Sequence, residues 1–81
     1  MKSPRKINAN NLIRFLSLHD YEVSRQKGSH IRLSKKDGSH HITVPNHDPI
    51  KIGTLNSILN DLSKHLNIEK ENLFEKLVDS I

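Results

Sequence analysis

The chain has 81 residues, the length of one small domain with a modest hydrophobic core, and we expect a single domain over residues 1–81. The absence of cysteine excludes a disulfide scaffold, a zinc ribbon and thiol catalysis, and the 33% hydrophobic content leaves little room for an enclosed small-molecule cofactor site. Thirteen lysines and arginines against nine acidic residues give a formal net charge of +4, which favours an anionic partner such as nucleic acid.

The N-terminal segment is basic but has no targeting signal that we can identify. Lys2, Arg5 and Lys6 are followed by no apolar stretch of signal-peptide length, and no run in the chain approaches the ~20 apolar residues of a membrane span. We therefore expect a cytoplasmic protein without a membrane partner.

The first periodic segment predicts a helix from about Ala9 to Leu18. Its apolar residues recur at i, i+3, i+4 and i+7, which places them in one stripe on a helix: Ala9, Leu12, Ile13 and Leu16. Either Asn8 or Asn10 can cap the start of the helix through a side-chain oxygen. At the other end, Asp20 can adopt the left-handed conformation more readily than most residues and so close the helix.

From Tyr21 to Val44 the hydrophobic period changes to two, which predicts three short strands. Turns are predicted at Lys27-Gly28 and at Lys36-Asp37-Gly38, because glycine and Asp-Gly accept positive φ. The strands therefore form an antiparallel meander, and its apolar pairs are Tyr21 and Val23, Ile31 and Leu33, and Ile42 and Val44.

The same alternation predicts which side chains the sheet leaves exposed. If the apolar residues face the helices, the polar residues between them lie on the opposite face of the sheet. In the second and third strands these residues are His30, Arg32, Ser34, His41 and Thr43.

The remainder of the chain predicts two further helices. Pro45 ends the third strand and residues 46–51 form a loop, after which apolar residues at helical spacing predict a helix over 52–65 and a shorter one over 70–80. The order is helix, three strands, helix, short helix. This order predicts an α+β fold in which helices cover one face of a three-stranded antiparallel sheet.

Three blocks of the sequence follow one another in a recognisable order: Arg25-Gln26-Lys27-Gly28-Ser29-His30, Ile42-Thr43-Val44-Pro45 with His47, and Gly53-Thr54-Leu55 with Ser57-Ile58-Leu59. Together these blocks resemble the HicA-type toxins, which are the RNA-cleaving partners of HicB-type antitoxins in toxin-antitoxin systems. The chain departs from the usual family pattern at two positions: Asp20 stands where a glycine often ends the first helix, and Asn56 stands where a basic residue is common.

The resemblance implies a fold similar to the double-stranded-RNA-binding domain and cleavage of messenger RNA with His30 as the catalytic residue. RNA carries its own nucleophile, so we expect cleavage without a metal ion or other cofactor, leaving a 2′,3′-cyclic phosphate and a 5′-hydroxyl. A HicB-type antitoxin is the expected protein partner. We expect contacts with RNA from the residues around the histidine, which are Arg25, Lys27, Ser29, Arg32 and Lys35.

Other interpretations of these residues stay open. The same fold and charge suit an RNA-binding module that does not cleave, for which His30 is dispensable, or an adaptor that binds an acidic protein. His41 shares the predicted open face and is a candidate second acid or base, whereas His47 is expected to make a structural hydrogen bond to its turn. His40 and His41 point to opposite faces as adjacent residues, so no metal site is expected there.

Overall fold

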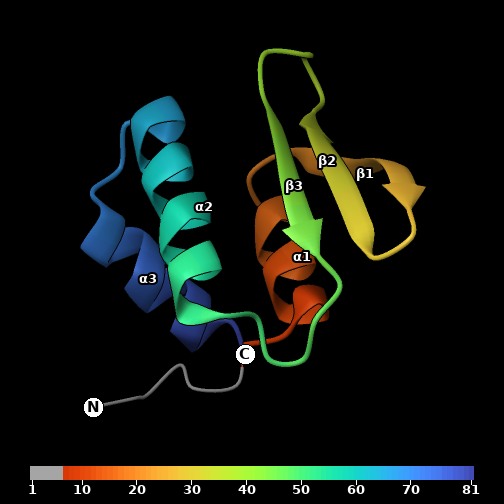
Figure 1. The fold of residues 1–81 in the computed structure, drawn as a ribbon. Helices are drawn as coiled ribbons and strands as arrows, with labels where there is room; N and C mark the ends of the chain where they lie inside the picture. The colour runs from red at the N-terminus through yellow and green to blue at the C-terminus, as the bar shows by residue number, and fades with distance from the viewer. Residues whose placement is uncertain (1–6) are drawn as a thin grey trace.

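Three helices and a three-stranded antiparallel sheet make up residues 7–81, the part of the chain that this computed structural model describes. The basic residues Lys2, Arg5 and Lys6 lie outside the described residues. The predicted order of elements and the α+β fold, similar to a double-stranded-RNA-binding domain, are confirmed (Figure 1). The elements are α1 (Ala9–Ser17), β1 (Tyr21–Lys27), β2 (His30–Lys35), β3 (His41–Pro45), α2 (Ile52–Leu66) and α3 (Lys70–Asp79).

The two ends of α1 follow local rules that the sequence makes visible. Asn8 is the N-cap: its side chain accepts a hydrogen bond from the Asn11 backbone N–H at 2.9 Å, and the Asn11 side chain accepts one from the Asn8 N–H at 3.0 Å. This reciprocal pair is a capping box and satisfies two donors at the helix start. After the helix, Asp20 adopts the left-handed conformation with φ 67°, as predicted.

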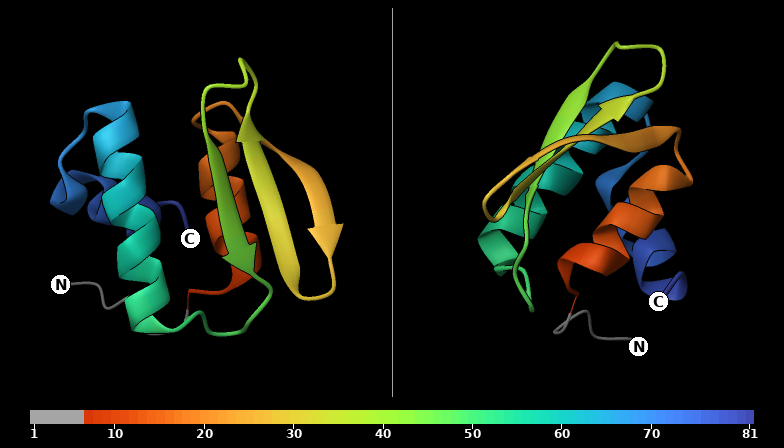
Figure 2. Two further views of the ribbon diagram at one scale, coloured as in Figure 1. Left: turned by 45° about the horizontal axis from the view of Figure 1, so that its top comes forward. Right: turned by 90° about the vertical axis from the view of Figure 1, so that its right-hand side faces the viewer.

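The sheet has the strand order β1-β2-β3, and its apolar side chains face the helices. In Figure 1, α1 passes behind the sheet and α2 stands beside β3, while Figure 2 shows the layering from two further directions. Strand residues Ile31, Leu33, Ile42 and Val44 join α1, α2 and α3 in one hydrophobic core. No helix among residues 7–81 is long and apolar enough to cross a membrane.

Val23 is a correction to the predicted core. The alternation places Val23 with Tyr21 against the helices, but Val23 is 51% exposed while Tyr21 is 1% exposed. Val23 does oppose the buried Leu33 in the register, so it lies on the helix side of the sheet. However, β1 is the edge strand on the side of the sheet away from α2, and beyond Tyr21 the strand runs past the helices (Figure 1).

The connection between β2 and β3 is longer than a tight Asp-Gly turn. A two-residue turn of type I′ needs positive φ at both central residues, but only Gly38, with φ 79°, has it. Residues 36–40 instead form a five-residue loop closed by a hydrogen bond from the Lys35 N–H to the His40 carbonyl at 2.8 Å. His40 therefore lies in the loop and not in the strand.

Candidate nucleic-acid interface

The face of the sheet that the helices leave uncovered, here called the open face, collects basic side chains from two strands because β1 contains a bulge. The register of β1 against β2 shifts between Val23 and Arg25, so Ser24 is an extra residue without a partner of its own. Beyond the bulge, Arg25 opposes Arg32 and Lys27 opposes His30.

This extra residue decides which way the basic side chains of β1 point. Strict alternation from Tyr21 would place Arg25 and Lys27 on the helix side. One added residue reverses the alternation for the rest of the strand, so both side chains project from the open face with Arg32 and His30. The sequence predicts open-face positions only in β2 and β3, and the bulge adds the two cations of β1 to that set.

The juxtaposed cations have no acidic partner. Arg25 and Arg32 are directly opposed, and such like-charge pairs on one face of a sheet are destabilising by about 0.2–1 kcal/mol. Arg25, Lys27 and Arg32 are all exposed and make no ion pair with any of residues 7–81. Within β1–β3, Glu22 is the acidic residue on the open face. It opposes Ser34 and so lies toward the end of the sheet away from His30. The end of the open face at His30 is therefore positively charged.

His30 begins β2 at the end of the sheet where β3 stops. It is exposed, and its register partners are Lys27 on one side and Pro45 on the other. Ser29 lies in the preceding turn, and its carbonyl accepts a hydrogen bond from the Asn46 N–H at 2.6 Å. The imidazole of His30 makes no hydrogen bond or ring contact with any side chain of the described residues. It is thus available to a ligand on the open face.

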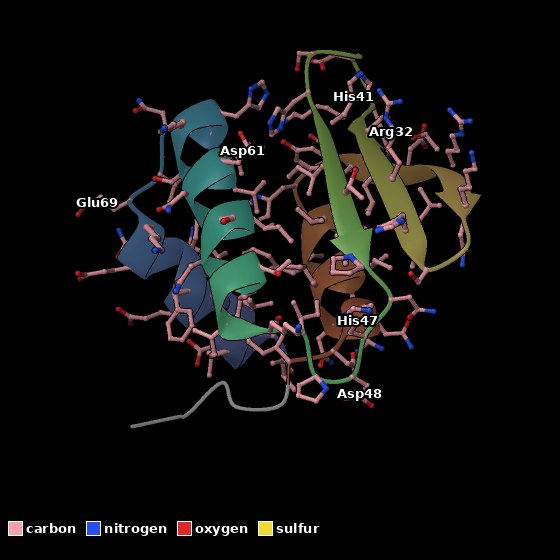
Figure 3. All side chains as sticks on the ribbon, in the orientation of Figure 1. Arg32, His41, His47, Asp48, Asp61 and Glu69 are labelled. Carbon is pink, nitrogen blue, oxygen red and sulfur yellow. The ribbon has the colours of Figure 1, made fainter. Side chains whose placement is uncertain are left out.

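His41 lies on the open face too, but at the other end. It opposes Ser34, four residues from His30 along β2, which places the two histidines about 13 Å apart at the rise of an extended strand. A hydrogen bond of 2.7 Å joins His41 Nδ1 to Ser34 Oγ, and another of 2.7 Å joins Ser34 Oγ to Ser24 Oγ. Figure 3 shows His41 with Arg32 toward the upper part of the sheet. The separation is too large for His30 and His41 to serve one phosphate.

Lys35 is the predicted RNA contact that the fold does not bring to the open face. Its register partner is the buried Tyr21, and its Nζ lies 5.4 Å from the centroid of the Tyr21 ring. This geometry is a cation–π contact, which lies on the helix side of the sheet. Arg25, Lys27 and Arg32 therefore gather near His30 without Lys35.

His47 comes to the same end of the sheet as His30, from the loop after β3 (Figure 3). Its hydrogen bonds to the loop are made by the backbone: the N–H donates to the Pro45 carbonyl at 2.8 Å, and the carbonyl accepts from the Ala9 N–H at 3.2 Å. The exposed imidazole makes no hydrogen bond with residues 7–81. The structural hydrogen bond expected of the His47 side chain is therefore not present; the main chain holds this turn.

Away from the open face, a second group of polar side chains fixes the β2–β3 loop to α2. This group, here called the polar cluster, comprises Tyr21, Ser39, His40, Asp61 and His65. His40 Nε2 donates to Asp61 Oδ1 at 3.1 Å, because a carboxylate only accepts, and its Nδ1 is hydrogen-bonded to the Tyr21 hydroxyl. The ring of His65 stacks on His40 with centroids 4.3 Å apart, and Ser39 bonds to His65 Nε2 at 3.2 Å. Figure 3 shows Asp61 on the side of α2 that faces β3.

Burial changes the chemistry of two rings on this side of the sheet. Desolvation, with smaller contributions from Asp61 and Asp37, raises the pKa of Tyr21 to about 12. Burial also lowers the pKa of His19, helped by the charges of Lys76 and Lys35, and the ring of His19 packs edge-on against Phe15 at 4.9 Å. Packing against Phe15 accounts for His19 without a functional role.

Two further sequence features lie elsewhere. Asn56, one of the two departures from the family pattern, lines a hollow between α2 and α3 with residues such as Phe74 and Glu75, so it does not belong to the open face. Among residues 7–81, no group of three or more histidine, aspartate or glutamate side chains is placed to hold a metal ion.

Comparisons with known proteins identify one family. A family model described as the HicA toxin of bacterial toxin-antitoxin systems matches residues 9–63, which span α1, the whole sheet and most of α2. No curated protein and no solved structure matches the chain.

Proposed function

Because this chain belongs to the HicA family of toxins from bacterial toxin-antitoxin systems, we propose that it is an endoribonuclease that binds and cleaves messenger RNA on the open face. The observation that carries the proposal is the bulge at Ser24. It turns Arg25 and Lys27 to the open face, where Arg32 of β2 and the exposed imidazole of His30 also lie, and none of the three cations has an acidic partner among the described residues.

These cations are arranged more favourably for binding a phosphate chain than for the stability of the free protein. Opposed arginines repel each other in the free protein, and an anion between them removes that repulsion. Arginine contacts phosphate with a planar fork of N–H donors, and lysine contributes a mobile point charge. RNA carries a series of phosphates, and this accounts for cations that extend along two strands instead of meeting at one point. Ser29, in the turn beside His30, is a further contact in this proposal.

The proposed reaction uses the 2′-hydroxyl of the RNA as the nucleophile. His30 transfers one of the two protons that the reaction moves, and imidazole, with an ordinary pKa of ~6.5 in peptides, is suited to either transfer. Arg32 lies two residues along the strand on the same face, about 7 Å away, and stabilises charge on the phosphorus centre. The products are a 2′,3′-cyclic phosphate and a 5′-hydroxyl, and no metal ion takes part.

The protein partner in this proposal is a HicB-type antitoxin that neutralises the toxin by covering the open face. Acidic side chains of the antitoxin pair with Arg25, Lys27 and Arg32 and exclude RNA from His30. Co-expression of the neighbouring reading frame is expected to relieve growth arrest caused by this chain. A neighbour product that neither binds the chain nor inhibits it contradicts the pairing.

The test of the ribonuclease uses wild type and His30→Ala, with His41→Ala as a matched control that removes an imidazole from the same face. Each protein is incubated with a messenger RNA, with and without a chelator, and the fragment ends are mapped. His30→Ala is expected to slow cleavage by about 10²–10⁴-fold while thermal unfolding and RNA binding are retained. His41→Ala is expected to cleave at close to the wild-type rate, and the chelator to change nothing.

The outcomes separate the alternatives. Equal cleavage by His30→Ala contradicts the role of the histidine, and a divalent-ion requirement with 5′-phosphate ends contradicts the metal-free reaction. RNA binding without cleavage by wild type favours the non-catalytic RNA-binding module of the same fold. No RNA binding even at low salt excludes both, because binding to phosphates strengthens as salt falls.

A further inference from the structure

We propose that His47 is the second proton-transfer residue of the site, acting with His30 on one scissile phosphate. The proposal rests on the ribonuclease function above and adds to it the residue that completes the reaction. Its basis is a juxtaposition: two exposed imidazoles without hydrogen bonds lie at one end of the sheet, beside three unpaired cations.

Backbone hydrogen bonds bring His47 to His30 from a distant part of the sequence. The Asn46 N–H donates to the Ser29 carbonyl at 2.6 Å, so the chain just after β3 is bonded to the turn just before His30. His30 also opposes Pro45 in the sheet, and the hydrogen bond from the His47 N–H to the Pro45 carbonyl turns the loop back at that point. His47 therefore lies two residues beyond Pro45, the register partner of His30, at the same end of the sheet.

The other four histidines have contacts that account for them. His40 and His65 belong to the polar cluster, His41 bonds to Ser34, and His19 packs on Phe15. All six histidines fall within residues 7–81, and of these only the side chains of His30 and His47 make no hydrogen bond, ion pair or ring contact there. An imidazole that stabilises nothing in the fold is one that a ligand can use.

The reaction needs two such groups. One imidazole takes the proton of the 2′-hydroxyl as the 2′-oxygen bonds to phosphorus, and the other, protonated at the start, gives its proton to the 5′-oxygen as the bond from phosphorus to that oxygen breaks. Proton exchange with water then restores both rings. His41 cannot be the partner of His30 because about 13 Å of strand separates them.

The test uses a short RNA that contains one cleavage site, made in two forms. One form is ordinary, and in the other the 5′-oxygen at the cleaved bond is replaced by sulfur, which leaves as a thiolate without needing a proton. Wild type, His30→Ala, His47→Ala and the control His41→Ala are compared on both. On the ordinary RNA we expect His47→Ala to be slowed by about 10²–10⁴-fold, as for His30→Ala. The sulfur substitution is expected to restore cleavage to the variant that lacks the acid and to leave the other variant slow.

A second measurement excludes a merely structural role for His47. Cleavage by wild type is expected to rise and then fall with pH, because one group must be neutral and the other protonated. His47→Ala is expected to lose one limb of this profile, and its fold is expected to persist because the loop is held by main-chain hydrogen bonds that alanine retains.

Each outcome bears on the proposal. Wild-type cleavage by His47→Ala, rescue of neither variant by sulfur, or an unchanged pH profile in His47→Ala overturns the role of His47 and leaves the ribonuclease in place. Failure of wild type to cleave either RNA overturns the ribonuclease itself. Rescue of one variant with loss of one pH limb establishes the pair and identifies which ring is the acid.

Discussion

The polar cluster and the open face at His30 use histidine in opposite ways. In the polar cluster, Tyr21, His40 and Asp61 bond to one another across three elements, and His65 stacks on His40. At the open face, Arg25 faces Arg32 and the imidazole of His30 contacts no partner among the described residues. Polar groups that satisfy one another hold the fold together, whereas polar groups that repel or lack partners are available to an external ligand.

The largest change in stability is expected from a substitution in the polar cluster. His40→Ala leaves the Tyr21 hydroxyl and the Asp61 carboxylate without their partner, so we expect the free energy of unfolding to fall by about 1–3 kcal/mol in urea titrations. RNA cleavage by the folded fraction is expected to persist. Unchanged stability, or specific loss of cleavage in a folded protein, would break the distinction between the two regions.

At the open face the expected change in stability is smaller and has the opposite sign. Arg25→Ala and Arg32→Ala each relieve the repulsion between the pair, so we expect the free energy of unfolding to rise by about 0.2–1 kcal/mol. Affinity for RNA is expected to fall for both variants, and the dependence of the binding constant on salt to weaken by about one unit of slope for each phosphate that the variant no longer neutralises. Lys64→Ala, on the exposed surface of α2, is the matched control for loss of one positive charge.

A pH titration of Tyr21 in the wild-type protein tests the polar cluster without a substitution that would destabilise the fold at neutral pH. Tyr21 is the only tyrosine in the chain, so phenolate absorbance reports this residue alone. We expect a midpoint at about 12 in the folded protein, because burial raises the pKa of Tyr21. The midpoint in denaturant is expected at about 10, the value for an unperturbed tyrosine.

The sign of the linked stability follows from that shift. A raised pKa in the folded state means that the contribution of Tyr21 is fully present below pH 10 and is lost as the pH rises to about 12. Compared with wild type, Tyr21→Phe is expected to lose less stability over this interval. A folded-state midpoint near 10 would show that the hydroxyl is not held in the polar cluster.

Most of the fold could be predicted from the sequence because the hydrophobic period changes clearly along the chain. The helix pattern from Ala9, the alternation in β2 and β3, and the later leucines define every element except β1, of which only Tyr21 and Val23 alternate, and Asp20 ends the first helix as its backbone preference indicates. The family blocks direct attention to His30 in the same way.

The arrangement of the site could not be predicted as fully. Residues Ser24 to Lys27 are all polar, so no apolar side chain among them shows which face each residue takes, and the bulge leaves no mark in the pattern. The helix-side position of Lys35, in contrast, follows from the alternation of Ile31 and Leu33 along β2, and only its contact with the Tyr21 ring depends on the pairing with β1. The proposed pairing of His47 with His30 depends on a backbone hydrogen bond between residues 17 positions apart, Asn46 and Ser29, which no local pattern reveals.

The bulge at Ser24 means that the direction in which the cations of β1 point is encoded by the number of residues in the strand and not by their identity. Substituting Ser24 removes its hydroxyl contact with Ser34 but leaves the count intact, so Arg25 and Lys27 keep their direction. Loss or gain of one residue between Val23 and Arg25 would instead exchange the two faces of one part of the strand. Variants of this toxin can therefore tolerate many replacements at this point, whereas a one-codon insertion or deletion would turn both cations of the strand away from the open face.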